Sequence, residues 1–218
     1  MQPVGDGILL DELGIAEISA GGIAERAAGC VLLLAAAPAI AASALLVFAL
    51  SRRSPFVAHR RVGRNGQLFW MLKLRTMWDR RGLSPRRGVW IERVVSEPNE
   101  DRKNPADPRV TSRLAAFFRR HSIDELPQLW HVARGEMSLV GPRPLTRAEL
   151  RHYGERVAEL LSVKPGLTGL WQVQGRSTVN FPERAAMDLE LVRTLSAKTY
   201  CKLLLRTVPA IFHDSGAW

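Results

Sequence analysis

The sequence predicts an α+β protein that is mostly helical, with one kinked membrane helix and one small antiparallel β-hairpin. Three observations support this class. Residues 29–50 form an apolar run without a charge, an Asn-Gly pair at 65–66 separates two β-prone segments, and helical periodicity dominates from residue 111 onward. We expect a leader, a membrane-inserted helix and one main domain, over residues 1–26, 27–51 and 52–218.

The chain of 218 residues is strongly basic, with 31 Lys and Arg against 21 Asp and Glu and a formal net charge of +10. Such a balance favours an anionic partner: nucleic acid, an anionic membrane surface or a phosphorylated substrate. We expect no nucleic-acid partner, because the sequence shows no recognisable nucleic-acid-binding module and carries a long apolar run. The two cysteines, Cys30 and Cys201, lack the number and spacing of a disulfide framework or a zinc site.

The apolar run at 29–50 would span about 33 Å as a helix, near the thickness of a bilayer core. A buried core helix is the alternative, but an all-round apolar helix of this length fits poorly in so small a protein. Pro38 removes a backbone hydrogen bond near the middle, so we expect a kink and a break of the helix there. Basic residues between positions 52 and 64 place the C-terminal flank in the cytosol. These observations leave open whether the helix spans the membrane or returns to the same face.

The elements after the run follow from local signals. Asn65-Gly66 predicts a hairpin with strands over residues 56–62 and 67–74, and the polar stretch 79–110 predicts a long surface loop. From Thr111 an amphipathic basic helix begins, which suits either a membrane interface or core packing. Further helices are expected over 122–133, 147–161 and 182–212, with a glycine-rich loop at 164–176.

Asp124 and Glu125 stand side by side at the start of one of these expected helices. One interpretation is structural, because Ser122 followed three residues later by Glu125 forms a capping box. Pro127 weakens it, since its missing N–H falls where the helix would have used one. The other interpretation is a catalytic pair of carboxylates. Local rule-breaking of this kind points modestly to function.

The surroundings of the pair favour chemistry on phosphate. Arg119, Arg120, Arg134 and Arg143 lie within a short distance along the chain, and Arg143 stands between two prolines. A rigid arginine of this kind suits fork-like binding of phosphate oxygens. One carboxylate can attack phosphorus to give an acyl phosphate, and a second can hold Mg²⁺. Beside a membrane segment, this pattern indicates a phosphorylated, membrane-held substrate.

Several aromatic residues and one histidine have two open interpretations. His131 lies two turns after Asp124 on the same expected helix face, where a site role and a packing role both fit. Trp70, Trp78 and Trp90 are candidate membrane-interface anchors, and Trp171 is a candidate lid or substrate contact. Core packing is the alternative for Trp70 and Trp171.

A set of motifs occurs in a familiar order, from about residue 24 to the C-terminus. They are RVGRNG (61–66), KLRTM (73–77), DPRVT (107–111), SIDELPQLW (122–130), GEMSLVGPRP (135–144) and KPGLTGLWQVQGR (164–176). Together they resemble the bacterial sugar transferase family, the monotopic polyprenyl-phosphate phosphoglycosyl transferases. The short N-terminus and the ending SGAW resemble the small exopolysaccharide branch.

The resemblance implies transfer of a sugar-1-phosphate from a UDP-sugar to undecaprenyl phosphate. UMP is released, and undecaprenyl-diphosphate-sugar forms through a covalent aspartyl-phosphosugar intermediate. It assigns Asp124 as the nucleophile and Glu125 as the residue that steers or deprotonates the acceptor, with both carboxylates holding Mg²⁺. The cations that it places near the phosphates are Lys73, Arg119, Arg143 and Arg176.

The resemblance also implies a re-entrant membrane helix whose two ends stay in the cytosol, at the bacterial inner membrane, with the catalytic domain on the cytosolic face. The family breaks this helix at a Ser-Pro pair, where this chain has Ala37-Pro38. Other departures are His59, His131 and Glu136, and no tyrosine follows Asp188 at the usual place. A homodimer is compatible with the resemblance. The competing hypothesis is a catalytically silent membrane scaffold in polysaccharide assembly, and the sequence does not select the sugar.

Overall fold

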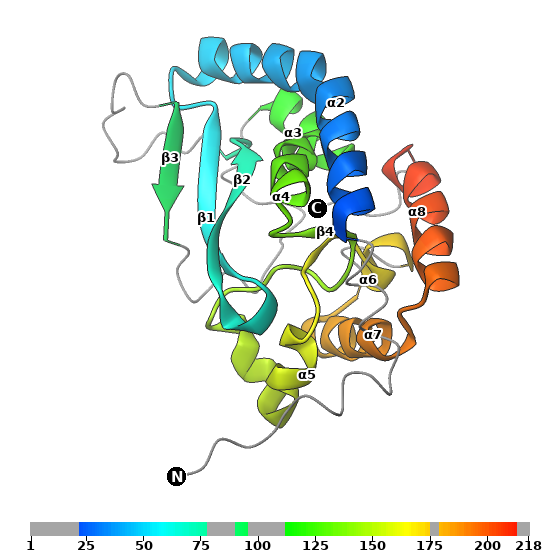
Figure 1. Ribbon diagram of the computed structural model, residues 1–218. Coiled ribbons are helices and arrows are strands. Elements are labelled where there is room, and N and C mark those ends of the chain that lie inside the picture. Colours follow the sequence, from blue (N-terminus) through cyan, green and yellow to red (C-terminus); the bar gives the residue numbers. More distant parts are fainter. Residues whose placement is uncertain (1–21, 78–89, 96–111, 175–178, 213–218) are drawn as a thin grey trace.

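We describe the protein from a computed structural model, over residues 22–77, 90–95, 112–174 and 179–212. Most of the predicted leader, together with Trp78 and Arg176, lies outside these ranges. The described part is mostly helical, with a three-stranded sheet in the order β2-β1-β3 and a two-stranded sheet of β4 and β5 (Figure 1). The predicted α+β, mostly helical class is confirmed.

The apolar run forms a single long helix, α2 (Gly22–Ser51), with Pro38 inside it. It begins inside the segment predicted as leader, and Figure 1 shows the ribbon changing direction near its middle. Most of its large apolar side chains are exposed, Leu34 by 74%, and the buried residues are Gly29, Ser43, Ala44 and Val47. The helix is long and apolar enough to cross a membrane. A buried core helix is therefore wrong for most of its length, while re-entrant insertion stays a prediction.

Close packing and the half-buried carboxylate of Glu25 hold the N-terminal half of α2 against the rest of the domain. A Cβ built on Gly29 would lie 2.9 Å from the Ala133 nitrogen, so the helix approaches its neighbour as closely as glycine permits. Glu25 accepts hydrogen bonds from the Leu139 N–H at 2.9 Å and from the Tyr200 hydroxyl. Burial raises the pKa of the Tyr200 hydroxyl, which suits a donor to this carboxylate. Glu25 therefore ties α2 to elements more than a hundred residues away, although the sequence placed it in an uninformative leader.

The predicted hairpin is confirmed. Strands β1 (Phe56–Val62) and β2 (Leu68–Leu74) pair antiparallel, with Phe56 opposite Leu74 and Val62 opposite Leu68. The turn η1 (Arg64–Gly66) holds Asn65 at φ 55° and Gly66 at φ 77°, the left-handed conformation that these two residue types tolerate best. The prediction of a surface loop over 79–110 is wrong in part. Strand β3 (Ile91–Val94) pairs parallel with β1, and its four residues are too few to show a clear alternation.

The helical half begins with α3 (Arg113–Arg120), which Ser112 caps by accepting from the Leu114 N–H. The next elements are η2 (Ile123–Gln128), α4 (Leu129–Arg134), β4 (Ser138–Val140), η3 (Glu149–Arg156) and α5 (Val157–Leu161). The last elements are β5 (Gly166–Thr168), α6 (Leu170–Gln174), α7 (Phe181–Thr194) and α8 (Ala197–Phe212). The predicted glycine-rich loop at 164–176 thus contains a strand and a short helix.

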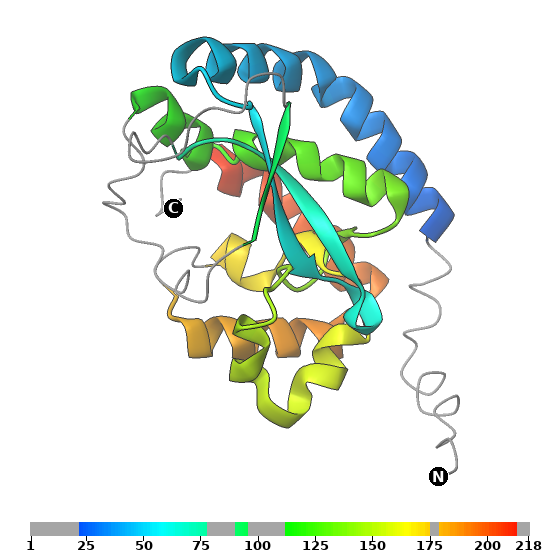
Figure 2. The ribbon, with the colours of Figure 1, turned by 90° about the vertical axis from the view of Figure 1, so that its left-hand side faces the viewer.

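Three predicted helices are each divided in the structure, and the one expected over 122–133 is η2 followed by α4. The helix expected over 147–161 is the 3₁₀ segment η3 followed by the α-helix α5, and Gly154 at φ 54° interrupts η3 itself. The helix expected over 182–212 is two helices, because Leu195 leaves the helical conformation at ψ 115°. The break lets α8 turn back along β4 and the N-terminal half of α2, while α7 crosses the end of the molecule away from the C-terminal half of α2 (Figures 1 and 2).

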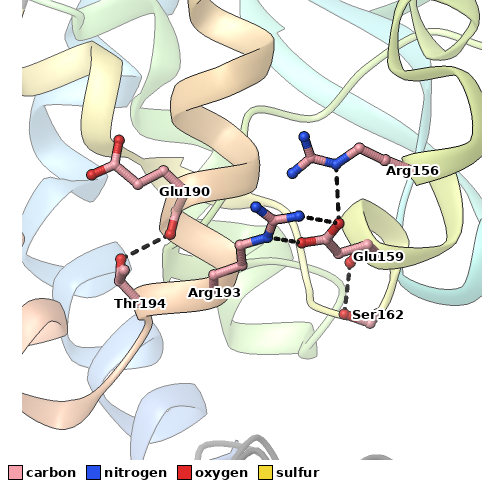
Figure 3. A network of polar contacts seen from close by, with 6 residues as sticks. All are labelled: Arg156, Glu159, Ser162, Glu190, Arg193 and Thr194. Carbon is pink, nitrogen blue, oxygen red and sulfur yellow. Dashed lines mark hydrogen bonds and ion pairs between the residues drawn. The ribbon is translucent and has the colours of Figure 1, made fainter.

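An ion-pair network joins α5 to α7 at the end of the molecule away from the C-terminal half of α2 (Figure 3). Glu159 accepts from Arg193 Nε at 2.6 Å and from Arg156 Nε at 3.2 Å. The pKa of the Glu159 carboxyl is lowered, and the hydrogen bond from Arg193 is the largest cause. All three side chains are partly exposed, so each pair adds about 0–1 kcal/mol to stability. The network joins α5 to α7 at a place remote from the paired carboxylates.

Candidate functional site

The segment that carries the paired carboxylates is a 3₁₀ turn rather than a capped α-helix. Ser122 has left-handed backbone angles (φ 54°, ψ 23°), and its side chain makes no capping hydrogen bond. The predicted capping box is therefore wrong, because only the main chain closes the turn, with the Glu125 N–H donating to the Ser122 carbonyl at 3.0 Å. Pro127 lies within the tight turn, where the regular α-helical hydrogen bond is not required of it. The Ser122 side chain thus does not cap the turn that carries the two carboxylates.

Glu125 lies between two of the predicted cations. Its Oε1 is 2.8 Å from Nζ of Lys73, which lies on β2, and 4.0 Å from Nη1 of Arg143, a residue just after β4. All three side chains are largely shielded from water, so the local dielectric constant is below that of water and these attractions are stronger than at a free surface. Segments that are far apart in the chain therefore supply a Lys–Glu–Arg cluster, which we call the carboxylate cluster.

The remaining predicted residues lie around this cluster to different degrees. Asp124 is 9% exposed and directly precedes Glu125 on η2, and Arg119 is half-buried at the end of α3, just before this turn. Arg176 lies outside the described residues. The described part of the chain holds no group of three His, Cys, Asp or Glu that could bind a metal. Two adjacent carboxylates nevertheless fit Mg²⁺, which takes one or two protein carboxylates and completes its shell with phosphate and water.

Beyond Arg143, the site is bordered by a group of residues around a buried tryptophan, which we call the Trp171 wall. Trp171 on α6 is 2% exposed, which favours the packing interpretation over a lid. The Arg143 guanidinium carbon lies 5.9 Å from the centre of its ring, and that of Arg184 on α7 lies 4.9 Å away. A substrate contact by the ring itself is unsupported at this burial. The ring instead supports two arginines by cation–π attraction.

The sequence analysis did not identify two further residues of this wall, Arg184 and Asp188, as site residues. Asp188, one turn after Arg184, is 1% exposed and accepts from the Tyr153 hydroxyl at 3.1 Å. Burial raises the pKa of Asp188 to about 7, against the opposing effects of the Tyr153 hydroxyl and the Arg143 main chain. Arg and Asp at i and i+4 usually mark a solvated helix face, so the sequence offered no signal that this pair is directed inward.

The close approach of β4 to β5 positions the segment that carries Arg143. Ser138 pairs with Gly166 and Val140 with Thr168 in parallel register. A Cβ built on Gly166 would lie 2.1 Å from the Gly141 nitrogen, so the chain can pass here only with glycine. The two prolines that flank Arg143 then limit its main chain. The predicted rigidity of this arginine therefore has a structural basis.

His131 serves packing rather than the site. Its Nε2 accepts from the Leu72 N–H at 3.0 Å, next to Lys73 on β2, and its Nδ1 lies 2.6 Å from Glu136 Oε2. Burial lowers the pKa of the imidazole below 6.5, against the raising effect of Glu136. The ring is 5% exposed and joins α4 to β2 behind the carboxylate cluster.

This bond predicts a loss of stability in acid. Because the folded-state pKa of His131 lies below its unfolded value, its contribution is complete above pH 6.5 and is lost as pH falls through the folded-state pKa. His131→Gln keeps an acceptor near Nε2 and should flatten the dependence of the melting temperature on pH between 5 and 7. His131→Leu leaves the Leu72 N–H unpaired and should cost about 1–3 kcal/mol at pH 7.5. An unchanged acid slope in His131→Gln would contradict this assignment.

Exposed aromatic side chains gather near the apolar helix. Trp90 is 58% exposed and stacks on Phe48 of α2 with ring centroids 5.8 Å apart, which fits the predicted interface anchor. Phe117 on α3 and Trp130 on α4 are also exposed, whereas Phe118 is buried, so α3 is both amphipathic and packed. Trp70 is instead a residue of strand β2, and the guanidinium carbon of Arg93 on β3 lies 5.5 Å from the centre of its ring. Aromatic rings of this kind suit a water–lipid boundary.

Comparison with known proteins agrees with the motifs. The family described as bacterial sugar transferase matches residues 20–214. The UDP-galactose-lipid carrier transferase of Erwinia amylovora is 41% identical over 80% of this chain, which spans only 37% of that protein. The exopolysaccharide production protein ExoY of Sinorhizobium fredii is 38% identical over 91% of this chain and 89% of its own length.

A third relative has a name that states a reaction. The UDP-glucose:undecaprenyl-phosphate glucose-1-phosphate transferase of Caulobacter vibrioides is 36% identical over 84% of this chain and 66% of that protein. The match to ExoY along most of both chains confirms the predicted resemblance to the small exopolysaccharide branch. The chain belongs to the bacterial sugar transferase family.

Proposed function

We propose that the protein transfers a sugar-1-phosphate from a UDP-sugar to undecaprenyl phosphate and releases UMP. The observation that carries this proposal is the carboxylate cluster: Glu125 between Lys73 and Arg143, directly after the buried Asp124, below an exposed apolar helix. Cations around carboxylates suit phosphate oxygens, and the apolar helix suits a lipid-held acceptor. The product, undecaprenyl-diphosphate-sugar, would begin the synthesis of an exopolysaccharide or a related glycan.

In the proposed first step an Asp124 carboxylate oxygen attacks the phosphorus that carries the sugar. A bond forms between this oxygen and phosphorus, the bond from phosphorus to the bridging oxygen breaks, and UMP leaves with the electron pair. In the second step a phosphate oxygen of undecaprenyl phosphate attacks the same phosphorus. The bond to Asp124 breaks and the carboxylate is regenerated, so the two displacements balance.

The neighbouring residues have separate roles in this proposal. Lys73 and Arg143 bind and orient phosphate oxygens, and Glu125 holds both cations in register with the nucleophile. Asp124 and Glu125 would hold Mg²⁺, which when bound neutralises phosphate charge. Arg119 and Arg176 are proposed as further phosphate contacts.

The proposed membrane association rests on α2. Its exposed apolar side chains and the aromatic rings near it support insertion into a membrane, and we propose that this is the bacterial inner membrane, with the site on the cytosolic face. A re-entrant path, bent at Pro38, would return both ends of α2 to that face and would keep the carboxylate cluster at the lipid headgroups. A homodimer stays a prediction.

The test is an assay of UMP release by the detergent-solubilised full chain with Mg²⁺. UDP-glucose, UDP-galactose and the two N-acetylated UDP-hexosamines are supplied in turn, with and without undecaprenyl phosphate. We expect one donor to give sustained UMP release that requires the lipid, since the relatives named for galactose and for glucose leave both sugars open. Folded protein that releases no UMP with any donor would favour the silent scaffold.

A further inference from the structure

Two guanidinium groups share one buried indole ring at the wall of the site. Arg143 comes from the segment after β4, Arg184 from α7, and Trp171 from α6, so three elements converge on this arrangement. Arg143 also reaches toward Glu125 at 4.0 Å, which makes it the bridge between the carboxylate cluster and Arg184. Lys73, Arg143 and Arg184 therefore extend the positive charge of the site from β2 to α7.

Arg184 has little to balance its charge. Its Nε is buried without a hydrogen-bond partner, and among the described residues no ion pair holds its guanidinium. Burial, followed by the positive charge of Arg143, lowers the pKa of Arg184. Asp188, on the same helix, accepts a hydrogen bond from the Tyr153 hydroxyl, and burial raises the pKa of its carboxyl to about 7. Shielded charges in folded proteins are normally paired, so this pair of like charges points to an anionic ligand.

Arg193 on the same helix shows the contrast. Two of its nitrogens lie 2.6 and 3.3 Å from the two oxygens of Glu159 (Figure 3). It is exposed and already satisfied, whereas Arg184 is half-buried and stacked on a ring. Stacking on an aromatic face leaves the N–H edge of a guanidinium free to bind oxygen atoms.

We propose that Arg184, together with Arg143, binds the diphosphate of the nucleotide-sugar donor, with Arg184 on the phosphate that leaves as part of UMP. Arg143 lies beside Glu125 and would contact the phosphate under attack, so the next cation outward falls to the leaving phosphate. The lipid phosphate is the other possible source of this anion. Its access is from α2, and α7 lies at the opposite end of the molecule from the C-terminal half of α2 (Figures 1 and 2).

This inference rests on the proposed function, and binding of UMP tests it without catalysis. Titration calorimetry would compare wild type with Arg184→Met, which keeps the stem against Trp171 and loses the charge. Because a hydrogen bond to a charged group is strong, Arg184→Met should weaken UMP binding by about 10–100-fold. Arg184→Lys, which keeps the charge without the fork, should fall between the two. Arg193→Met is the matched control and should bind UMP as wild type does.

The outcomes separate the competing explanations. Unchanged UMP affinity in Arg184→Met, with an unchanged melting temperature, would overturn the assignment and leave Arg184 as a packing residue. Unchanged UMP affinity with a raised KM for undecaprenyl phosphate would move the residue to the acceptor and equally overturn it. Wild-type protein that binds no UMP or UDP would remove the proposed function itself, and this inference with it.

Discussion

Asp124→Asn should abolish lipid-dependent UMP release, lowering it by about 10⁴-fold or more, as removal of a covalent nucleophile does in other enzymes. The amide has almost the same shape as the carboxylate, so the buried site should stay folded. It cannot attack phosphorus at a useful rate, because it carries no negative charge. The measurement is initial UMP release with the donor found active for wild type, with and without undecaprenyl phosphate.

A second readout follows the covalent intermediate directly. Wild type incubated with donor but without lipid should gain the mass of one phosphosugar, and Asp124→Asn should not. Glu190→Gln is a matched control, since this exposed carboxylate on α7 is remote from the site and only its main-chain carbonyl accepts a hydrogen bond. An adduct on Asp124→Asn, or release above a tenth of the wild-type rate, would remove Asp124 from the role of nucleophile.

Features set by short-range signals were predictable from the sequence. Asn65-Gly66 specified the hairpin because its backbone angles are accessible mainly to such residues, and the apolar run specified α2 by composition alone. The proximity of Lys73, Glu125 and Arg143 came from the family resemblance rather than from physics. Periodicity carries no information about which strand lies against which turn.

Features set by long-range contacts were not predictable. The capping box failed because Glu125 pairs with Lys73, 52 residues away in the chain, and this contact competes with the local one. Glu25 and Arg184 looked like ordinary polar residues, and only the folded chain brings Glu25 to β4 and Arg184 to Trp171. Strand β3 exists because β1 offers an open edge, which no local pattern announces.

The same comparison explains why the basic composition was ambiguous. Part of the excess charge is concentrated around the carboxylate cluster and the Trp171 wall, while Arg156 and Arg193 serve only a surface ion-pair network. A count of charges weighs both kinds equally. Burial distinguishes them, because shielding from water strengthens the attraction between a cation and an anion, whereas water screens an exposed ion pair.

Glu125→Gln should lower the rate of UMP release by about 10²–10³-fold, within the range by which mispositioned or unbalanced catalytic groups slow a reaction. Glutamine has the same shape, but its neutral amide cannot hold Lys73 Nζ at 2.8 Å and Arg143 at 4.0 Å by charge. The requirement for Mg²⁺ should rise if this carboxylate also holds the ion. Activity would be measured across Mg²⁺ concentrations, with the covalent adduct followed in parallel.

A double variant decides what Glu125 does for the reaction. If the carboxylate only balances the charge of Lys73, then Lys73→Met in the Glu125→Gln background should recover most of the stability and be no slower than Lys73→Met alone. If the carboxylate acts on the substrate or on Mg²⁺, the double variant should regain stability but be slower than Lys73→Met alone by about the factor that Glu125→Gln costs in the wild-type background. We expect the second result, because Arg143 would still lack its carboxylate partner and the phosphate under attack would still lack the group that orders the cations around it.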